Sequence, residues 1–120
     1  MTDYQMGAVE SRFADLIWQN EPLSSTELAK RSLALLGWKK STAYTVLKRL
    51  CDKGIFQNTG GKVTARLTRQ EFYARQSRRF VEETFHGSLP AFLTAFTAGK
   101  GLTAQEVAQL QQLIDSYKEE

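Results

Sequence analysis

The sequence predicts a mainly α-helical protein with one small β-hairpin, on three observations. Apolar residues recur at helical spacing in most segments of the 120-residue chain. A serine or threonine precedes a glutamate by three residues at several expected helix starts. The pair Gly60-Gly61 separates two short runs that read as strands. The expected order is therefore helices, a hairpin, and further helices.

The N-terminal part is expected to form two helices. The first is predicted over residues 5–20, and a capping box from Ser24 to Glu27 opens the second, which runs to about Leu35 before Gly37 ends it. The expected apolar positions are Met6, Val9, Phe13, Leu16 and Ile17 in the first helix and Leu28, Leu33, Leu35 and Leu36 in the second.

A third helix is predicted over residues 40–53, with Gly54 as its left-handed C-terminal residue. Its apolar face consists of Ala43, Val46, Leu47 and Leu50. The opposite face carries Ser41, Tyr44, Thr45, Lys48 and Asp52, with Thr42 and Arg49 at its edge. This face is expected to lack the acid–base pairs of a merely solvated helix. Hydroxyls, an amphipathic aromatic ring and cations are the groups that bind phosphates and base edges.

The hairpin is predicted from residues 55–58 and 62–67. Its second strand alternates Val63, Ala65 and Leu67 with Thr64, Arg66 and Thr68, so that one face is apolar and the other basic and hydroxylic. Helices followed by a basic hairpin are typical of a winged helix-turn-helix. In that fold the third helix lies in the DNA major groove, the second crosses the backbone, and the hairpin, or wing, reaches flanking phosphates or the minor groove.

The net charge of +3 is an average over unequal parts. Residues 1–69 carry +5 and residues 70–120 carry −2. Residues 30–69 hold ten lysines and arginines against Asp52 alone, a net charge of +9. This window is either the footprint of a nucleic-acid contact or a solvated basic face, and charge alone does not decide between them.

The last third of the chain predicts helices from Thr68 to about His86, over residues 89–98, and from Thr103 onward. Five of the seven phenylalanines lie in residues 70–120. We expect this apolar surface to form a homodimer interface, although a compact subdomain packed on the wing is the alternative. The chain therefore divides into a DNA-binding domain, 1–69, and a helical dimerisation region, 70–120. The expected dimerisation residues are Phe80, Phe85, Phe92, Phe96, Val107, Leu110, Leu113 and Ile114.

The sequence lacks the residues that several classes of function require. Cys51 and His86 are the single residues of their types, which excludes an internal disulfide and leaves no set of zinc ligands or Cys–His nucleophile. No carboxylate pair beside a histidine and no glycine-rich phosphate loop occurs, so we expect no enzyme, no cofactor and no metal. The chain has no long apolar run and no secretory signal, and we expect it in the cytoplasm.

The most specific block of the sequence runs from Trp38 to Leu50 and is followed by Lys53-Gly54-Ile55. With Leu16-Ile17-Trp18 and residues 25–29, it resembles the penicillinase-repressor (BlaI/MecI) family over nearly the whole chain. The resemblance implies a dimeric transcriptional repressor that binds inverted-repeat operator DNA, often with TACA/TGTA half-sites.

The same resemblance bears on regulation. In the β-lactam systems of the family, a membrane-bound sensor-protease triggers cleavage of the repressor, commonly at an Asn-Phe bond. The matching place here is Ala95-Phe96, where the phenylalanine is present and the asparagine is not. Copper-responsive members carry a cysteine-rich C-terminal motif. Residues 116–120 contain no cysteine, which argues against metal sensing by that route.

Individual roles follow from the winged-helix interpretation. Tyr44 and Lys48 are the expected base readers, with Thr45 also facing the groove. Ser41 and Thr42 either bind phosphate near the helix N-terminus or cap the helix. The expected phosphate contacts are Lys39, Lys40, Arg49, Lys62 and Arg66, although Arg49 is equally well explained by an ion pair with Glu10 or Asp15. Trp38 is expected to lie in the core or to anchor the turn, and Cys51 to be a small packed residue.

Two other binding functions stay open at this point. Some winged helices bind proteins instead of nucleic acid, although the +9 window disfavours this alternative. The second alternative is a winged-helix regulator of another family, whose C-terminal helices bind a small-molecule inducer.

Overall fold

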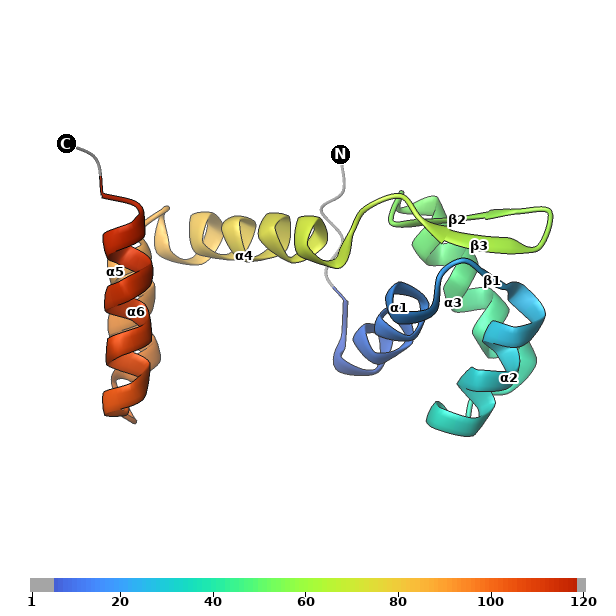
Figure 1. The fold of residues 1–120 in the computed structure, drawn as a ribbon, viewed down its shortest axis with the longest axis horizontal. Coiled ribbons are helices and arrows are strands. Elements are labelled where there is room, and N and C mark those ends of the chain that lie inside the picture. Colours follow the sequence, from blue (N-terminus) through green and yellow to red (C-terminus); the bar gives the residue numbers. More distant parts are fainter. Residues whose placement is uncertain (1–5, 119–120) are drawn as a thin grey trace. The chain divides into compact units, whose positions relative to one another are not determined.

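The computed structural model describes residues 6–118, which form two compact units (Figure 1). The first unit ends at Arg79 and the second begins at Phe80, so the boundary falls inside a helix. In chain order the elements are α1 (Ala8–Asn20), β1 (Leu23–Ser24), α2 (Ser25–Leu36), α3 (Lys40–Asp52), β2 (Phe56–Thr59), β3 (Lys62–Ala65), α4 (Arg69–Phe85), α5 (Leu89–Thr97) and α6 (Ala104–Ser116). The predicted fold class, mainly helical with a small sheet, is confirmed.

Local signals start and end the helices of the first unit much as predicted. The Ser24 hydroxyl accepts a hydrogen bond from the Glu27 amide at 2.9 Å, which caps α2. Gly37 ends α2 with a φ of 71°, and Gly54 follows α3 with a φ of 82°. The predicted capping box at α2 is only half formed, because the described hydrogen bonds direct the Glu27 carboxylate to Arg31 instead of back to the Ser24 backbone.

The first unit contains a three-stranded antiparallel sheet in the order β1-β3-β2. Strands β2 and β3 form the predicted hairpin, with Phe56 opposite Ala65 and a tight turn at Gly60 and Gly61, whose φ values are 60° and 87°. The strand β1 was not predicted. A two-residue strand is too short to show an alternating pattern, and its pairing with β3 is fixed by the tertiary fold.

The core of the first unit lies between α1, α2, α3 and the sheet. Its fully buried large side chains include Phe13 and Ile17 from α1, Leu28 from α2, Leu50 from α3, Phe56 and Val63 from the sheet and Phe72 from α4. Trp18 joins these layers, because its ring packs near Phe56 and its Nε1 donates to the Leu67 carbonyl at 2.9 Å. Trp38 is partly buried against the core and packs on Phe13 with ring centroids 5.1 Å apart, which agrees with the expected core position.

Three expected core positions are wrong. Val9 is exposed, and Leu33 and Leu35 are each 59% exposed. α2 buries the expected Leu28 together with Ala29 and Ser32, and Ser32 follows these two by four and three residues. Leu33 and Leu35 lie outside this buried stripe. The Ser32 hydroxyl is accommodated because it donates to the Leu28 carbonyl at 2.8 Å. α1 begins at Ala8, and residue 5, where it was expected to start, lies outside the described residues.

The second unit consists of the end of α4, with α5 and α6. Ser88 caps α5, and a complete capping box between Thr103 and Glu106 opens α6, as predicted. No described residue of α5 or α6 is buried. Phenylalanine rings line up through Phe80, Phe85, Phe92 and Phe96, with neighbouring centroids 5.6–6.0 Å apart. This unit is therefore held by an aromatic cluster that stays partly open to solvent.

Candidate nucleic-acid interface

α3 presents two chemically different faces. Ala43, Val46, Leu47 and Leu50 are buried against the core and fix how the helix is rotated about its axis. The side chains on the other face are exposed, and they are Ser41, Thr42, Thr45, Lys48 and Arg49. The helix is thereby a fixed support for a polar face rich in hydroxyls and cations, as the sequence predicted.

Tyr44 lies at the edge between these faces. It is half-buried and packs against the core, and Lys40 Nζ lies 5.8 Å from its ring centroid. The ring therefore has a structural role that the sequence interpretation, which placed Tyr44 among the base readers, left out. Being only half-buried, Tyr44 keeps part of its side chain in solvent.

The first turn of α3 carries Ser41 and Thr42. The N-cap position belongs to Lys39, whose side chain forms no capping hydrogen bond. Neither hydroxyl therefore occupies the N-cap, and the capping alternative has no support in this geometry. The turn contains no acidic side chain, so the partial positive charge of the helix N-terminus is reinforced by Lys39 and Lys40.

Lys48 corrects one part of the sequence interpretation. Its ammonium group pairs with the Asp52 carboxylate at 3.2 Å, so the exposed face of α3 does carry an acid–base pair. The two side chains are 77% and 64% exposed. A pair this exposed contributes a few tenths of a kcal/mol. Lys48 can leave Asp52 for another anionic or hydrogen-bonding partner at small cost.

Arg49 pairs with Glu10, one of the two partners that the sequence left open. Arg49 Nη1 donates to Glu10 Oε2 at 2.5 Å, joining α3 to α1. Asp15, the other candidate, instead accepts from Arg69 Nε at 2.8 Å, and this bond raises the pKa of the Arg69 guanidinium. Part of the +9 window is thus neutralised within the fold by acidic residues of α1.

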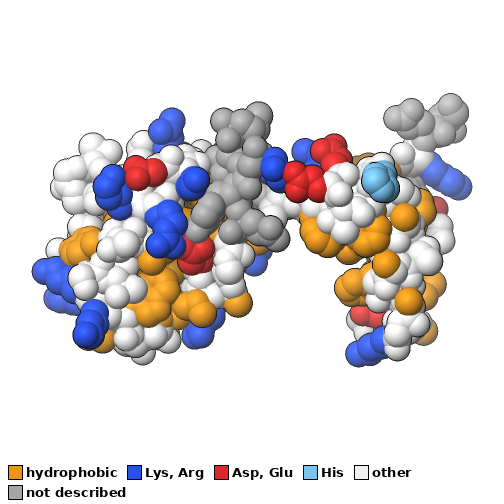
Figure 2. All heavy atoms as spheres, turned by 180° about the vertical axis from the view of Figure 1, so that it is seen from behind, with side chains coloured by type: hydrophobic (Ala, Val, Ile, Leu, Met, Phe, Trp, Pro, Cys, Tyr) orange, Lys and Arg blue, Asp and Glu red, His pale blue; other side chains and the backbone are white. Residues whose placement is uncertain are grey.

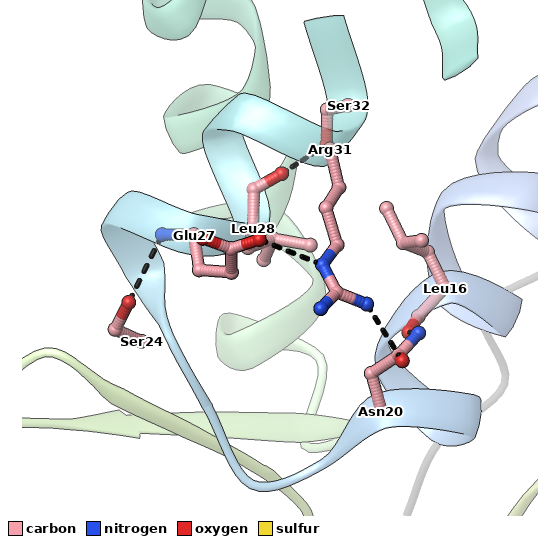
Figure 3. Close-up of polar contacts among 7 residues, drawn as sticks. All are labelled: Leu16, Asn20, Ser24, Glu27, Leu28, Arg31 and Ser32. Atoms are coloured by element: carbon pink, nitrogen blue, oxygen red, sulfur yellow. Dashed lines mark hydrogen bonds and ion pairs between the residues drawn. The ribbon is translucent and has the colours of Figure 1, made fainter. Parts of the chain in front are cut away.

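Arg31 is held in a polar network between α1 and α2, drawn in Figure 3. Its Nε donates to Glu27 Oε2 at 2.9 Å and its Nη1 to Asn20 Oδ1 at 2.7 Å (Figure 3). The hydrogen bond from Arg31 is the main reason that the pKa of Glu27 is lowered. Asn20 in turn donates to the Leu16 carbonyl at the end of α1. This arginine is therefore a structural part of the basic window.

The wing carries Lys62 and Arg66, both exposed. Its outer edge is held by the chain between α1 and α2. Leu23 pairs with Val63, the Ser25 amide donates to the Gly61 carbonyl at 2.8 Å, and the Ala65 amide donates to Glu21 Oε1 at 2.7 Å. Sequence reasoning missed Glu21, because its partner lies 44 residues away and no local pattern marks it.

The second unit exposes apolar side chains over much of its surface (Figure 2). A groove of about 420 Å³ lies between α5 and α6, lined mainly by Phe92, Leu93, Phe96, Leu102, Leu110 and Leu113. The predicted dimerisation residues Val107, Leu113 and Ile114 are each about half exposed. The Ala95-Phe96 bond lies inside α5, so cleavage there requires the helix to unwind locally.

Residues 6–118 give little support to metal binding, a reactive thiol or a membrane-spanning helix. Among them, no group of three or more His, Cys, Asp and Glu residues could hold a metal ion. Cys51 is half-buried, and burial, aided by Asp52, raises the pKa of its thiol against the opposing effect of Lys48. A raised pKa leaves less of the thiol as the reactive thiolate. None of the helices in the described part of the chain has both the length and the apolar character to cross a bilayer.

Comparison with known proteins agrees with this architecture. The family model described as penicillinase repressor matches residues 6–116. A curated relative, the "Penicillinase repressor" of Bacillus licheniformis, is 23% identical over 118 residues, covering 95% of this chain and 92% of the relative. The family match spans the winged helix and the C-terminal helices together. The chain therefore belongs to the penicillinase repressor family, whose members are transcriptional regulators and not enzymes.

Proposed function

We propose that the protein is a dimeric repressor that binds inverted-repeat operator DNA, with α3 in the major groove. One observation carries this proposal: α3 has one face locked into the core while the other presents Ser41, Thr42, Thr45 and Lys48 to solvent. A rigid helix with such a face satisfies the requirement for reading base edges in the groove. Tyr44, which is half-buried at the edge of this face, contributes through the part of its side chain that stays in solvent.

Phosphate contacts are proposed around this helix. Lys39 and Lys40 lie at the start of α3, where the helix dipole also favours an anion. Lys62 and Arg66 lie on the wing. Arg49 is already paired with Glu10, so its proposed phosphate contact would be shared with a structural role. Such contacts fix the register of the protein on the duplex without reading sequence.

The C-terminal helices are proposed as the dimer interface. No described residue of α5 or α6 is buried, which leaves these helices without a core of their own. The groove between them is apolar and lined largely by phenylalanine and leucine. An apolar surface of this kind is typical of a face that a second copy covers. The proposal keeps the division into a DNA-binding domain, 1–69, and a dimerisation region, 70–120, although the first compact unit continues through the buried Phe72 to Arg79.

A protein-binding winged helix is the competing proposal. The exposed Leu33 and Leu35 on α2 favour it, because large apolar side chains on a DNA-binding domain have no role in phosphate contact. The exposed polar face of α3 favours DNA instead.

The test is a fluorescence anisotropy titration with a labelled duplex from the promoter of the protein's own gene. We expect two chains per duplex and binding at least about 10³-fold tighter than to a scrambled duplex. Log affinity should fall with log salt by about 0.9 for each phosphate contacted. Absence of binding to any duplex at low salt would overturn the proposal in favour of a protein partner.

A further inference from the structure

The outer edge of β3 is covered over a longer stretch than the two paired residues of β1. Leu23 lies opposite Val63 and Ser24 opposite Lys62. Continuing this antiparallel register places Ser25 opposite Gly61, and the Ser25 amide does donate to the Gly61 carbonyl at 2.8 Å. The ladder therefore extends one step beyond β1 towards the tip of the wing.

At the other end the same register places Glu21 opposite Ala65. Pro22 lies between Glu21 and β1, opposite Thr64, at a position of the ladder where opposite residues exchange no backbone hydrogen bond. The Ala65 amide instead donates to the side chain of Glu21, at 2.7 Å from Oε1. The Glu21 carboxylate thus supplies the acceptor at the position where strand pairing stops.

Ala65 stands directly before Arg66, and the bonds around it hold the base of the wing. The amides of Arg66 and Leu67 both donate to the Ile55 carbonyl, at 2.8 and 3.2 Å. The Leu67 carbonyl accepts from Trp18 Nε1 at 2.9 Å. Of these bonds, only the one from Ala65 to Glu21 depends on an exposed side chain that can be replaced without touching the core.

We propose that Glu21 is a positioning residue for the wing, acting through Ala65 to hold Arg66 where it contacts a DNA phosphate. The inference rests on the proposed DNA-binding function. A carboxylate on a DNA-binding domain opposes binding by its charge, so a role in DNA affinity has to come through this hydrogen bond. Loss of the acceptor frees the Ala65 amide and lets the base of the wing move.

The test compares Glu21→Gln with Glu21→Met. Both variants lose the negative charge and keep the length of the side chain, but only the Glu21→Gln variant keeps an oxygen that can accept from Ala65. We expect Glu21→Met to bind the promoter duplex about threefold to tenfold more weakly than Glu21→Gln. Its salt slope should be smaller by about 0.9, the value for one lost phosphate contact.

Two further arms separate the inference from the proposed function. In free protein, hydrogen exchange at the Ala65 amide should accelerate in Glu21→Met and stay near the wild-type rate in Glu21→Gln. In an Arg66→Ala background, Glu21→Met and Glu21→Gln should bind the duplex with equal affinity. If wild-type protein binds DNA but the two single variants bind alike, or exchange alike at Ala65, the positioning role is wrong. If wild-type protein binds no DNA, the proposed function itself fails, whatever the exchange data show.

Discussion

Arg49 on α3 donates to Glu10 on α1 across 2.5 Å, and this ion pair ties the proposed recognition helix to the helix behind it. The Glu10 side chain is 16% exposed and that of Arg49 is 47% exposed, so solvent screens the pair only in part. Four buried side chains already hold α3 against the core, so the ion pair adds to the stability of this arrangement but is not its main cause.

Replacing either partner of this pair should reduce stability modestly. We expect Glu10→Gln to lower the free energy of unfolding by about 1 kcal/mol or less, the range for partly exposed pairs. Urea unfolding of Glu10→Gln, Arg49→Ala and the double variant measures their coupling. A coupling energy of zero would show that the contact contributes nothing to holding α3.

Lys48→Ala should weaken operator binding far more than it changes stability. We expect a loss of about 1–3 kcal/mol in specific binding, the value for a good base contact. The exposed pair with Asp52 adds only a few tenths of a kcal/mol to folding. Anisotropy titrations measure the first effect and urea unfolding the second.

Two matched controls accompany this variant. Lys118→Ala removes the same charge from a residue after α6 and should leave specific affinity nearly unchanged. Asp52→Ala removes the partner but keeps Lys48, and binding should stay equal or tighten. Equal affinities for Lys48→Ala and wild type would remove Lys48 from the base-reading set.

Phe72→Ala should destabilise the first unit by about 3–5 kcal/mol, as expected for a buried phenylalanine in a well-packed core. Phe72 is 1% exposed, and its ring centroid lies 6.0 Å from that of Trp18. Both tryptophans of the protein, Trp18 and Trp38, lie in the first unit, so tryptophan fluorescence during urea unfolding reports on that unit alone. Phe96→Ala, in the second unit, is the control and should leave this transition in place.

Ile114→Asp should shift the protein from dimer to monomer. Ile114 is 53% exposed on α6, and a charge buried there by a second copy would stay unpaired and costly. Sedimentation velocity measures the change. Gln112→Asp adds the same charge to an exposed polar position of the same helix and should leave the dimer intact. An unchanged dimer in Ile114→Asp would place the interface elsewhere.

The free energy of unfolding should fall at alkaline pH because of Cys51. Burial raises the pKa of this thiol in the folded state, so the folded protein keeps a proton that the unfolded chain loses. The contribution is fully present below the ordinary thiol pKa of about 8.5 and is lost as pH rises through the higher folded value. Urea unfolding from pH 7 to 10 tests this. Cys51→Ser should flatten the alkaline part of the curve, and an identical slope would rule Cys51 out as its cause.

Much of the fold could be predicted because its signals are local. The boundaries at Gly37 and Gly54 depend on glycine in a left-handed conformation, and the start of α6 on Thr103 and Glu106. Features set by distant residues could not be predicted. Periodicity alone does not say which side of α2 meets the core, so the exposure of Leu33 was missed. The bond from Ala65 to Glu21 spans 44 residues and leaves no trace in the local sequence.

The candidate site divides in the same way. The polar face of α3 follows from helical spacing, and the structure leaves it exposed. The availability of its cations does not follow from spacing. Arg31 donates a hydrogen bond to Asn20, and Arg49 donates one to Glu10. These acceptors come close to the arginines only in the folded chain. A count of basic residues therefore overstates the charge that remains for a partner.

The two-residue turn of the wing limits how this family member can tolerate insertions and deletions. Its tip is fixed twice, by the glycine conformations at Gly60 and Gly61 and by the bond from the Ser25 amide to the Gly61 carbonyl. An extra residue between Lys62 and Val63 would shift β3 by one position from Val63 onward and move Val63 off the buried face on which it pairs with Leu23. Protein engineers who wish to retune DNA preference in this scaffold should therefore substitute wing side chains and keep the wing length unchanged.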